Sequence, residues 1–261
     1  MARILAALGL LGLGLPVLGL LVRAVADGTL TTEVAARPVA DALGLSLVTT
    51  AASLVLTVGL GLPLALVLAR GAFRGRSLVD AIVDLPIVLP PAVAGLALLL
   101  LLGRRGILGE PLADLGLNLP FTTAAVVIAQ AFVSAPFFVR SARFGIASVD
   151  RDLEDAARVD GASDRQVLLR ITLPLAASAV RGGLVMSWAR SLGEFGATIM
   201  FAGNVEGRTQ TLPLLVYGEF QAGSLETSIA AGAILVLAAL GVLVAVRGLG
   251  WSRALDIGRF A

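Results

Sequence analysis

Long apolar stretches separated by short charged segments dominate the chain from end to end. An α-helix needs about 20 predominantly apolar residues to cross a bilayer. The charge-free stretches that reach or approach this length are Ile4 to Val22, Ala42 to Ala69, Leu85 to Gly103, Leu115 to Val139 and Thr227 to Val246. This pattern predicts five transmembrane helices. Kinks or offset starts are expected in the third and fourth, which contain Pro86, Pro90, Pro91, Pro120 and Pro136.

A sixth apolar stretch, Val180 to Ala202, is interrupted by Arg190 and Glu194 near its middle. Each charge would cost about 2.5–3.5 kcal/mol at the centre of an isolated span, so other helices must shelter this one. A spacing of four residues places both side chains on one helix face, where they can pair. The pair can fix helix packing, and it can line or gate a translocation route, with Arg190 offering positive potential to an anion. The two roles do not exclude each other. Neighbouring backbones can come close to the small residues beside it, which are Gly193, Gly196 and Ala197.

The distribution of arginine among the connecting segments predicts the orientation of the helices. With both termini in the cytoplasm, the inner segments hold fourteen arginines and the outer segments hold five. Six spans with both ends inside are therefore the consistent topology. The first stretch has an alternative as a cleaved signal peptide, because Ala24-Val25-Ala26 resembles a cleavage site. Its apolar run exceeds the usual core of about 7–15 residues, so we expect a retained helix.

The composition supports a membrane protein and excludes several kinds of chemistry. Hydrophobic residues make up 57% of the 261 residues and charged residues 15%, against about 25% charged in a soluble domain. Neither cysteine nor histidine occurs, which removes disulfides, thiolates and imidazole metal ligands. There is no Walker-type nucleotide-binding loop, so we expect no ATP hydrolysis by this chain. The formal net charge is only +2, and a nucleic-acid partner would need a basic patch without this hydrophobic bulk, so we expect no such partner and no cofactor. We expect an all-α protein with one transmembrane domain over residues 1–261.

The longest cytoplasmic loop, from about Arg140 to Arg181, is predicted to form two short helices joined at Gly161. Asp150 can cap the first helix, and Ser163 with Gln166 three residues later fits a capping box for the second. Gly161 stands where the first helix must end and the chain must turn. A loop of this kind can be a plain solvated connection between two spans. The spacing of its small, acidic and proline residues, however, is more specific than such a connection requires.

Within this loop, Asp155-Ala156-Ala157, three residues, Gly161, nine residues and Ile171-Thr172-Leu173-Pro174 resemble the EAA motif of ABC importer permeases. The motif usually begins with Glu, whereas here Asp155 holds that position and Glu154 precedes it. The resemblance implies a coupling helix within residues 148–174 that docks into a groove on a cytoplasmic ATP-binding-cassette ATPase subunit. The residues implied in this coupling are Glu154, Asp155, Ala156, Ala157, Gly161, Ile171, Leu173 and Pro174.

Three further segments are similar to molybdate permeases of the ModB type, namely Trp188 to Tyr217, Leu85 to Gly103 and Ser134 to Arg143. Together with the loop, the resemblance covers most of a core at residues 43–247. It implies a type I ABC importer permease that forms a homodimer in the cell membrane, with the path at the dimer interface and an extracytoplasmic oxyanion-binding protein. Molybdate is the expected anion. Tungstate and sulfate or thiosulfate are the alternatives, because their permeases share much of this pattern.

The external segment Gly203 to Thr211 follows the charged helix and is polar. It is either a plain exposed turn or a segment that helps to receive the anion and to contact the binding protein. The predicted path and gate residues are Arg190, Gly193, Glu194, Gly196, Thr209 and Thr211.

Two other kinds of function compete with import. A gradient-driven carrier or channel would use Arg190 and Glu194 as its charged site, but it leaves the EAA-like spacing unexplained. We find no convincing internal repeat, which counts against a carrier built from inverted halves. An intramembrane hydrolase would need Glu194 with Asp84, and no carboxylate pair at catalytic spacing supports it.

Overall fold

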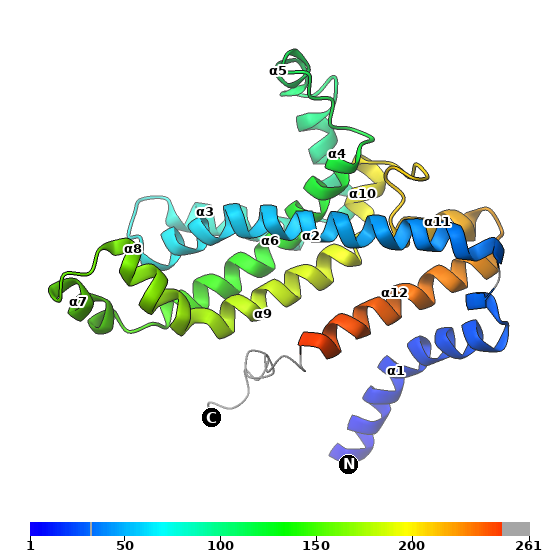
Figure 1. The fold of residues 1–261 in the computed structure, drawn as a ribbon, viewed down its shortest axis with the longest axis horizontal. Coiled ribbons are helices and arrows are strands. Elements are labelled where there is room, and N and C mark those ends of the chain that lie inside the picture. The colour runs from blue at the N-terminus through cyan, green and yellow to red at the C-terminus, as the bar shows by residue number, and fades with distance from the viewer. Residues whose placement is uncertain (32, 247–261) are drawn as a thin grey trace. The chain divides into compact units, whose positions relative to one another are not determined.

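The computed structural model describes residues 1–31 and 33–246, and the regular structure of these residues is entirely helical (Figure 1). Its α-helices are α1 (Ala2–Ala26), α2 (Glu33–Arg70), α3 (Arg76–Val88), α4 (Pro91–Leu102), α5 (Gly109–Asp114), α6 (Thr123–Ala147), α7 (Arg151–Val159), α8 (Asp164–Val167), α9 (Leu173–Leu192), α10 (Gly196–Phe201), α11 (Leu212–Gln221) and α12 (Leu225–Val246). A 3₁₀ turn covers Thr29–Thr31 and a π-helical turn covers Leu168–Thr172. The all-α prediction is confirmed for the described residues. The arginines that support an inner C-terminus, Arg247, Arg253 and Arg259, lie outside them.

Five helical segments of the described chain are long and apolar enough to cross a membrane. They are Ala2–Ala26, Ala36–Arg70, Thr123–Ala147, Asp164–Leu192 and Leu225–Ala245. Helices α3 and α4 provide a sixth span if the bent pair counts as one. The chain is therefore a multi-pass membrane protein, as its apolar stretches predict.

Prolines explain why the third predicted span is not one straight helix. Helix α3 ends at Val88, and α4 begins at Pro91 after a bend of 117°. Leu89 and Pro90 between them are each followed by a proline and adopt extended backbone, because a following proline ring disfavours the helical conformation. With 12 residues, α4 alone extends only about 18 Å. The predicted kink is confirmed, and the apolar stretch is divided at this break.

The fourth span has the offset start expected from Pro120 within Leu115 to Val139. Helix α6 starts at Thr123 and not at Leu115, because Thr122 is its N-cap. The Thr122 side chain accepts a hydrogen bond from Ala125 N at 3.3 Å. Phe121 just before the cap has a φ of 59°, which is incompatible with a helix that continues from earlier residues.

The sixth span also differs from the prediction, which placed one helix over Val180 to Ala202. Its helical segment begins at Asp164 and ends at Leu192, with Gly193 as the C-cap. Helix α10 follows only after a short non-helical break. Gly193 favours a helix end at this point because glycine has low helix propensity.

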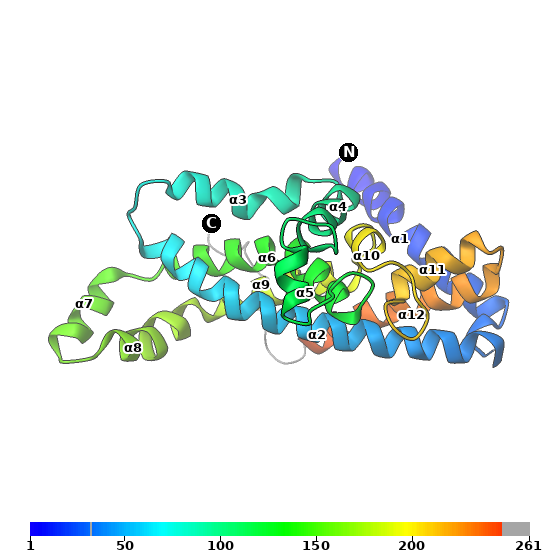
Figure 2. The same cartoon turned by 90° about the horizontal axis from the view of Figure 1, so that it is seen from above.

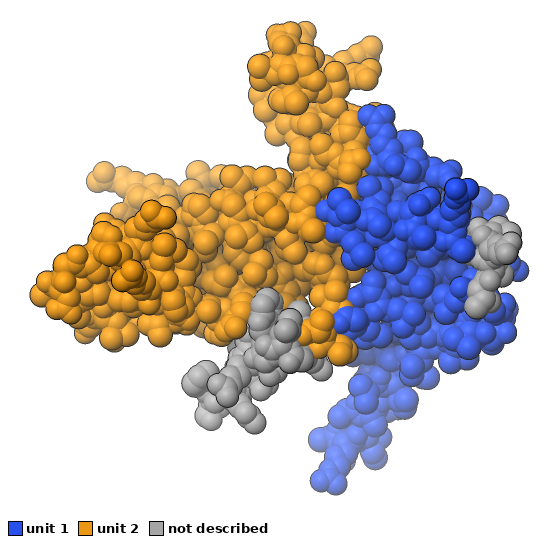
Figure 3. Space-filling view, in the orientation of Figure 1, with its two compact units in different colours: residues 1–48, 203–241 blue, residues 49–202, 242–261 orange. Residues whose placement is uncertain are grey.

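The described chain divides into two compact units (Figure 3). Unit 1 comprises residues 1–48 and 203–241, and unit 2 comprises residues 49–202 and 242–246 of the described chain. The apolar core of unit 1 contains Val39, Ala42, Leu212, Leu215, Ala230 and Ala231. Unit 2 has one cluster around Phe138 and Ile146 and another around Val126 and Phe201. The single transmembrane domain stays a prediction.

Helices α6 and α9 lie side by side in unit 2 (Figures 1 and 2). They approach closely where α9 carries Gly183. A Cβ atom at this position would lie 2.9 Å from Ser141 Cβ and 3.2 Å from Phe138 O, both on α6. Small residues allow this approach, as is common between helices in membranes.

Candidate functional site

Residues 148–174 form a helical loop whose two short helices begin at local caps. Helix α7 follows Asp150, whose carboxylate accepts a hydrogen bond from Asp152 N at 3.0 Å. Helix α8 follows Ser163, whose side chain forms a reciprocal capping box with Gln166. Ser163 N donates to Gln166 Oε1 at 2.8 Å. Both predicted caps are confirmed.

Gly161 terminates α7 in the left-handed conformation, with a φ of +90°. Its N–H donates to Arg158 O at 3.0 Å, and Ala162 N donates to Ala157 O at 2.9 Å. These two bonds are those of a Schellman motif, which satisfies the last carbonyl groups of a helix. No atom lies within 4 Å of a Cβ built at Gly161. Backbone conformation, and not crowding, therefore favours glycine here, and the predicted turn is confirmed.

The outer surface of this loop is exposed and combines small, apolar and charged residues. Asp155 and Ala156 are exposed, and the Val159 side chain at the tip is 87% exposed. Arg158 lies 2.7 Å from Asp155 Oδ1 and 3.1 Å from Asp164 Oδ1. The hydrogen bond to Asp164 raises the pKa of the Arg158 guanidinium above its ordinary value, and the hydrogen bond to Asp155 raises it by a smaller amount. Exposed ion pairs of this kind contribute little to stability.

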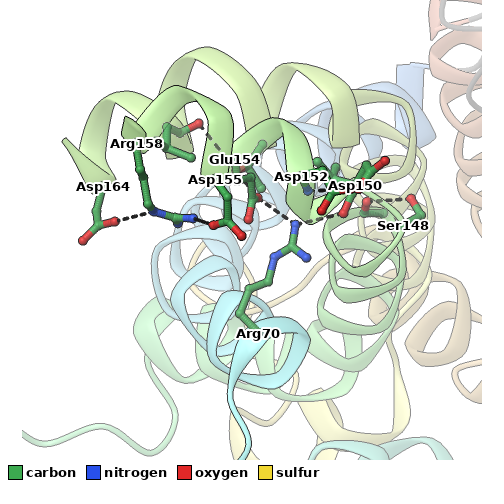
Figure 4. A network of polar contacts seen from close by, with 12 residues as sticks. Arg70, Ser148, Asp150, Asp152, Glu154, Asp155, Arg158 and Asp164 are labelled. Carbon is green, nitrogen blue, oxygen red and sulfur yellow. Dashed lines mark hydrogen bonds and ion pairs between the residues drawn. The ribbon is translucent and has the colours of Figure 1, made fainter. Parts of the chain in front are cut away.

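Glu154 of α7, in contrast, is buried, with 5% of its surface exposed. Its Oε1 accepts a hydrogen bond from Thr172 Oγ1 at 2.6 Å. It accepts another from Arg70 Nη2 at 2.7 Å (Figure 4). Arg70 Nη2 also donates to Val149 O at 3.2 Å. These contacts, named here the Glu154 network, join Arg70 at the end of α2, Glu154 on α7 and Thr172 just before α9. Arg70 carries no local sequence signal for this role, because 84 positions separate it from Glu154.

The other predicted coupling residues lie where the loop enters α9. Ile171 and Leu173 are half-buried, and Pro174 is exposed. Pro174 is the second residue of α9, where a missing N–H is tolerated. These three residues flank the Glu154 network, whereas Ala156 and Gly161 belong to the exposed part of the loop.

The predicted ion pair between Arg190 and Glu194 is present, although α9 ends between the two residues. Arg190 Nη1 lies 2.6 Å from Glu194 Oε2. Glu194 Oε1 accepts a hydrogen bond from Ala197 N at 2.7 Å, in the first turn of α10. The Glu194 side chain is 1% exposed and that of Arg190 is 28% exposed. The pair therefore spans the break in the sixth membrane segment and ties α10 to the end of α9.

The small residues beside this pair differ in their surroundings. A Cβ at Gly196 would lie 2.6 Å from Pro91 Cβ, so this glycine permits close contact with α4. Ala197 is fully buried, and its backbone carbonyl faces Gly95 of α4. The predicted close approach is confirmed at both positions. Gly193 is exposed, and the only atom near its built Cβ is Ala189 O at 3.7 Å.

A cluster of buried hydroxyl groups lies near the ion pair, and the sequence analysis missed it. Ser53 Oγ of α2 lies 2.8 Å from Ser191 Oγ of α9, which donates to Ser134 Oγ of α6 at 3.2 Å. All three side chains are fully buried. They link three helices through hydrogen bonds, which are favourable where water is excluded. The sequence signal is a stripe of hydroxyl residues on α2 at helical spacing, made of Ser46, Thr49, Thr50, Ser53 and Thr57.

The external segment is held together by one of its predicted path residues. Thr209 is buried, and its Oγ1 accepts a hydrogen bond from Val205 N at 2.9 Å and donates to Gly203 O at 3.3 Å. Thr211 is 1% exposed, and its hydroxyl has no hydrogen-bond partner among the described residues. Both threonines belong to unit 1, whereas the predicted path residues at 190–196 belong to unit 2.

The two acids considered for a hydrolase contact different arginines. Asp84 Oδ1 lies 3.5 Å from Arg140 Nε, while Glu194 pairs with Arg190. Among the described residues, no group of three or more acids could hold a metal ion. The geometry therefore gives Glu194 and Asp84 separate ion pairs in place of a shared site.

Comparison with known proteins assigns the family. Residues 61–249 match the family described as binding-protein-dependent transport system inner membrane component. The chain belongs to this family. The matched region of this inner membrane component includes the loop at residues 148–174 and the ion pair of Arg190 and Glu194.

Several relatives of this inner membrane component have names that refer to molybdenum. The chain is 44% identical over 176 residues to the molybdenum transport system permease protein ModB of Mycobacterium tuberculosis, which covers 67% of each chain. It is 38% identical over 233 residues to a probable molybdenum ABC transporter permease protein of Haloferax volcanii, covering 89% of this chain and 84% of that one. The molybdate/tungstate transport system permease protein WtpB of Pyrococcus abyssi is 36% identical over 211 residues, covering 81% and 78%.

Solved structures show the same fold at low sequence identity. A chain of a bacterial ABC transporter involved in the import of the acidic polysaccharide alginate superposes with a TM-score of 0.72 at 20% identity, covering 99% of this chain and 95% of that one. A chain of an amino acid ABC transporter gives a TM-score of 0.59, also at 20% identity, covering 83% and 94%. The fold of this inner membrane component is thus that of type I ABC importer permeases.

Proposed function

We propose that the chain is the membrane-spanning permease subunit of an ABC importer that carries an oxyanion, with molybdate as the preferred cargo, into the cytoplasm. The observation that carries the proposal is the coincidence of two features in one chain. The relatives named above transport molybdenum or molybdate and tungstate according to their names. The loop at residues 148–174 combines the EAA-like spacing with an exposed, well-capped geometry.

The proposed contact for the ATPase subunit is the exposed part of this loop. Ala156 and Gly161 offer close backbone approach, and Asp155 and Arg158 supply a polar rim, as at other protein interfaces. Its caps and the Schellman turn make the loop rigid enough to transmit a rigid-body movement. ATP hydrolysis then belongs to the separate subunit, and this chain contributes no catalytic group.

The remaining partners follow from the proposed class. Two copies of the chain enclose the path, an extracytoplasmic binding protein delivers the anion, and both termini lie in the cytoplasm. The presence of a periplasmic binding protein in one similar structure, that of an alginate transporter, supports such a partner. Selectivity then resides largely in the binding protein, because a pore that must release its cargo cannot bind it tightly.

Reconstitution tests the proposed class. Proteoliposomes that contain the permease, its ATPase and the binding protein should accumulate labelled molybdate only when ATP is supplied on the ATPase side. Omission of the ATPase is the control and should abolish uptake. Uptake by the permease alone, driven by an ion gradient, would overturn the proposal in favour of a carrier or channel.

Competition tests the choice of anion. Unlabelled tungstate should reduce labelled molybdate uptake, because it is a tetrahedral anion of the same charge and similar size, and sulfate should compete less. Stronger competition by sulfate than by molybdate would assign the chain to sulfate transport and leave the ABC importer class intact.

A further inference from the structure

In the Glu154 network, residues from the end of α2 and from the start of α9 bind the same carboxylate oxygen of α7. Glu154 Oε1 accepts a hydrogen bond from Arg70 at 2.7 Å (Figure 4) and one from Thr172 at 2.6 Å. The side chain of Glu154 is 7% exposed and that of Arg70 is 23% exposed. Hydrogen bonds to an ionised group are shorter and stronger than neutral ones, particularly away from water. The network therefore fixes α7 against the end of α2 and the start of α9.

Arg70 also holds the beginning of the loop. The same Nη2 that contacts Glu154 donates to Val149 O, one residue before the N-cap of α7. A single guanidinium thus positions both the backbone before α7 and the buried face of that helix. Movement of α7 without α2 would break both contacts at once.

The π-helical turn at Leu168–Thr172 places Thr172 toward Glu154. π-Helical turns are rare in proteins, and those that occur are often found at functional sites. Successive side chains of an α-helix are rotated by about 100° around its axis. A π-helical turn contains more residues per turn, so it changes the direction of the Thr172 side chain relative to the side chains of α9. Thr172 is 3% exposed, and its hydroxyl lies 3.5 Å from Val167 O, five residues earlier, besides its bond to Glu154. The loop and α9 therefore meet at a hydrogen bond as well as through the backbone.

The outer charges of the loop have a different character. Asp155, Arg158 and Asp164 form exposed pairs on the surface proposed for the ATPase. They are exposed, whereas Glu154 is buried, and no hydrogen bond or ion pair connects the two sets among the described residues. The loop thus combines exposed charges that are accessible to a partner with a buried carboxylate that is bound to α2 and to the start of α9.

We infer that Glu154 is a positioning residue that couples the loop to α2 and α9, so that movement imposed on the outer face reaches both helices together. The inference rests on the proposed docking of an ATPase at this loop. Without the network, the loop still binds the ATPase. Its displacement then moves α7 without moving the end of α2 and the start of α9 to the same extent. The expected consequence is ATP hydrolysis that drives less transport.

The test measures the number of anions transported per ATP hydrolysed in proteoliposomes that contain the complete complex. Glu154→Ala should retain ATPase binding and should keep ATP hydrolysis within about twofold, while the transport ratio falls by about tenfold, as expected if a charged hydrogen bond is lost. Thr172→Val, which removes one donor, should lower the ratio in the same direction by a smaller factor. Asp152→Asn, an exposed acid of α7 outside the network, is the matched control and should keep the wild-type ratio.

The outcomes separate this inference from the proposed function. If the wild-type complex shows no ATP-dependent uptake, the proposed function fails. If the wild type transports but Glu154→Ala keeps its ratio, or loses hydrolysis and uptake in equal proportion, the network has only a structural role and the inference is wrong. If Glu154→Ala does not assemble, the ratios of Glu154→Gln and Thr172→Val decide, and wild-type ratios in both overturn the inference.

Discussion

Two adjacent acids, Glu154 and Asp155, have opposite environments in this chain. Glu154 is buried against Arg70 and Thr172, whereas Asp155 is exposed beside Arg158. The rotation of about 100° per residue along α7 separates the two carboxylates in this way. At the scale of the residue, Asp155 holds the acidic position of the EAA-like spacing, whereas the neighbouring Glu154 makes the buried contacts that stabilise the fold.

Arg70→Met should destabilise the protein because it leaves the Glu154 carboxylate buried without its cation. We expect a loss of about 3 kcal/mol in the free energy of unfolding, at the lower end of the range for buried pairs because Arg70 remains partly exposed. Denaturant unfolding in detergent measures this loss. The double variant Arg70→Met with Glu154→Met should recover most of it, since two apolar side chains need no partner. An equally unstable double variant would show that the ion pair is not the cause.

Helix contacts in unit 2 depend on positions where a side chain would not fit. Helices α6 and α9 meet at Gly183, and α4 and α10 meet at Gly95 and Gly196. At the scale of the element, these glycines matter because van der Waals contact between close backbones is a principal source of helix association in membranes.

Gly183→Ala should weaken the packing of α9 on α6. The added Cβ would meet Ser141 Cβ at 2.9 Å and Phe138 O at 3.2 Å, and a backbone oxygen cannot rotate away. The expected loss of stability is about 1–3 kcal/mol, as for other overpacked cores. Thermal unfolding in detergent measures it. Gly59→Ala on α2 is the control with nothing within 4 Å, and it should be neutral or slightly stabilising because alanine favours helix.

Gly161→Val should disrupt the turn between α7 and α8 and reduce the amount of ATPase that copurifies with the permease. A β-branched residue in the left-handed conformation costs about 1–2 kcal/mol or more. Gly161→Asn is the matched control, because asparagine tolerates this conformation and the space around Gly161 is open. Equal copurification of ATPase with both variants and the wild type would contradict a role for this turn in docking.

Exposed apolar side chains characterise the molecule as a whole. Along α1, for example, Leu10 is 75% exposed and Leu13 is 81% exposed. Contiguous apolar surface of this kind is a liability in water, whereas the bilayer or a partner helix covers it without cost. At this scale, we also expect the ion pair of Arg190 and Glu194 in the sixth membrane segment to contribute to transport.

Variants of Arg190 and Glu194 should separate structure from transport. Arg190→Gln alone should destabilise the permease, because it leaves Glu194 buried and unpaired. Arg190→Gln with Glu194→Gln should restore stability in detergent, since Gln at position 194 can still accept from Ala197 N. We expect molybdate uptake by the double variant to remain severalfold below wild type because positive potential has been lost. Full recovery of uptake together with stability would assign the pair to packing alone.

Local features of the fold were predictable because they depend on neighbouring residues. The caps at Asp150 and Ser163, the turn at Gly161 and the kink near Pro90 all follow from short sequence patterns. The break after Leu192 was missed, because an apolar run on both sides of Gly193 is equally compatible with one continuous helix. A propensity effect of about 1 kcal/mol at one glycine is too small to decide between the two.

By itself, the sequence determined the class of protein, the approximate membrane segments and the form of the cytoplasmic loop. Apolar length and capping patterns act within a few turns of one helix, so they can be read along the chain. Only the tertiary structure decided that Glu154 faces Arg70 and Thr172, and that Ser53, Ser134 and Ser191 share one hydrogen-bonded cluster. These contacts join segments far apart in the sequence, and their partners are selected by how the helices pack.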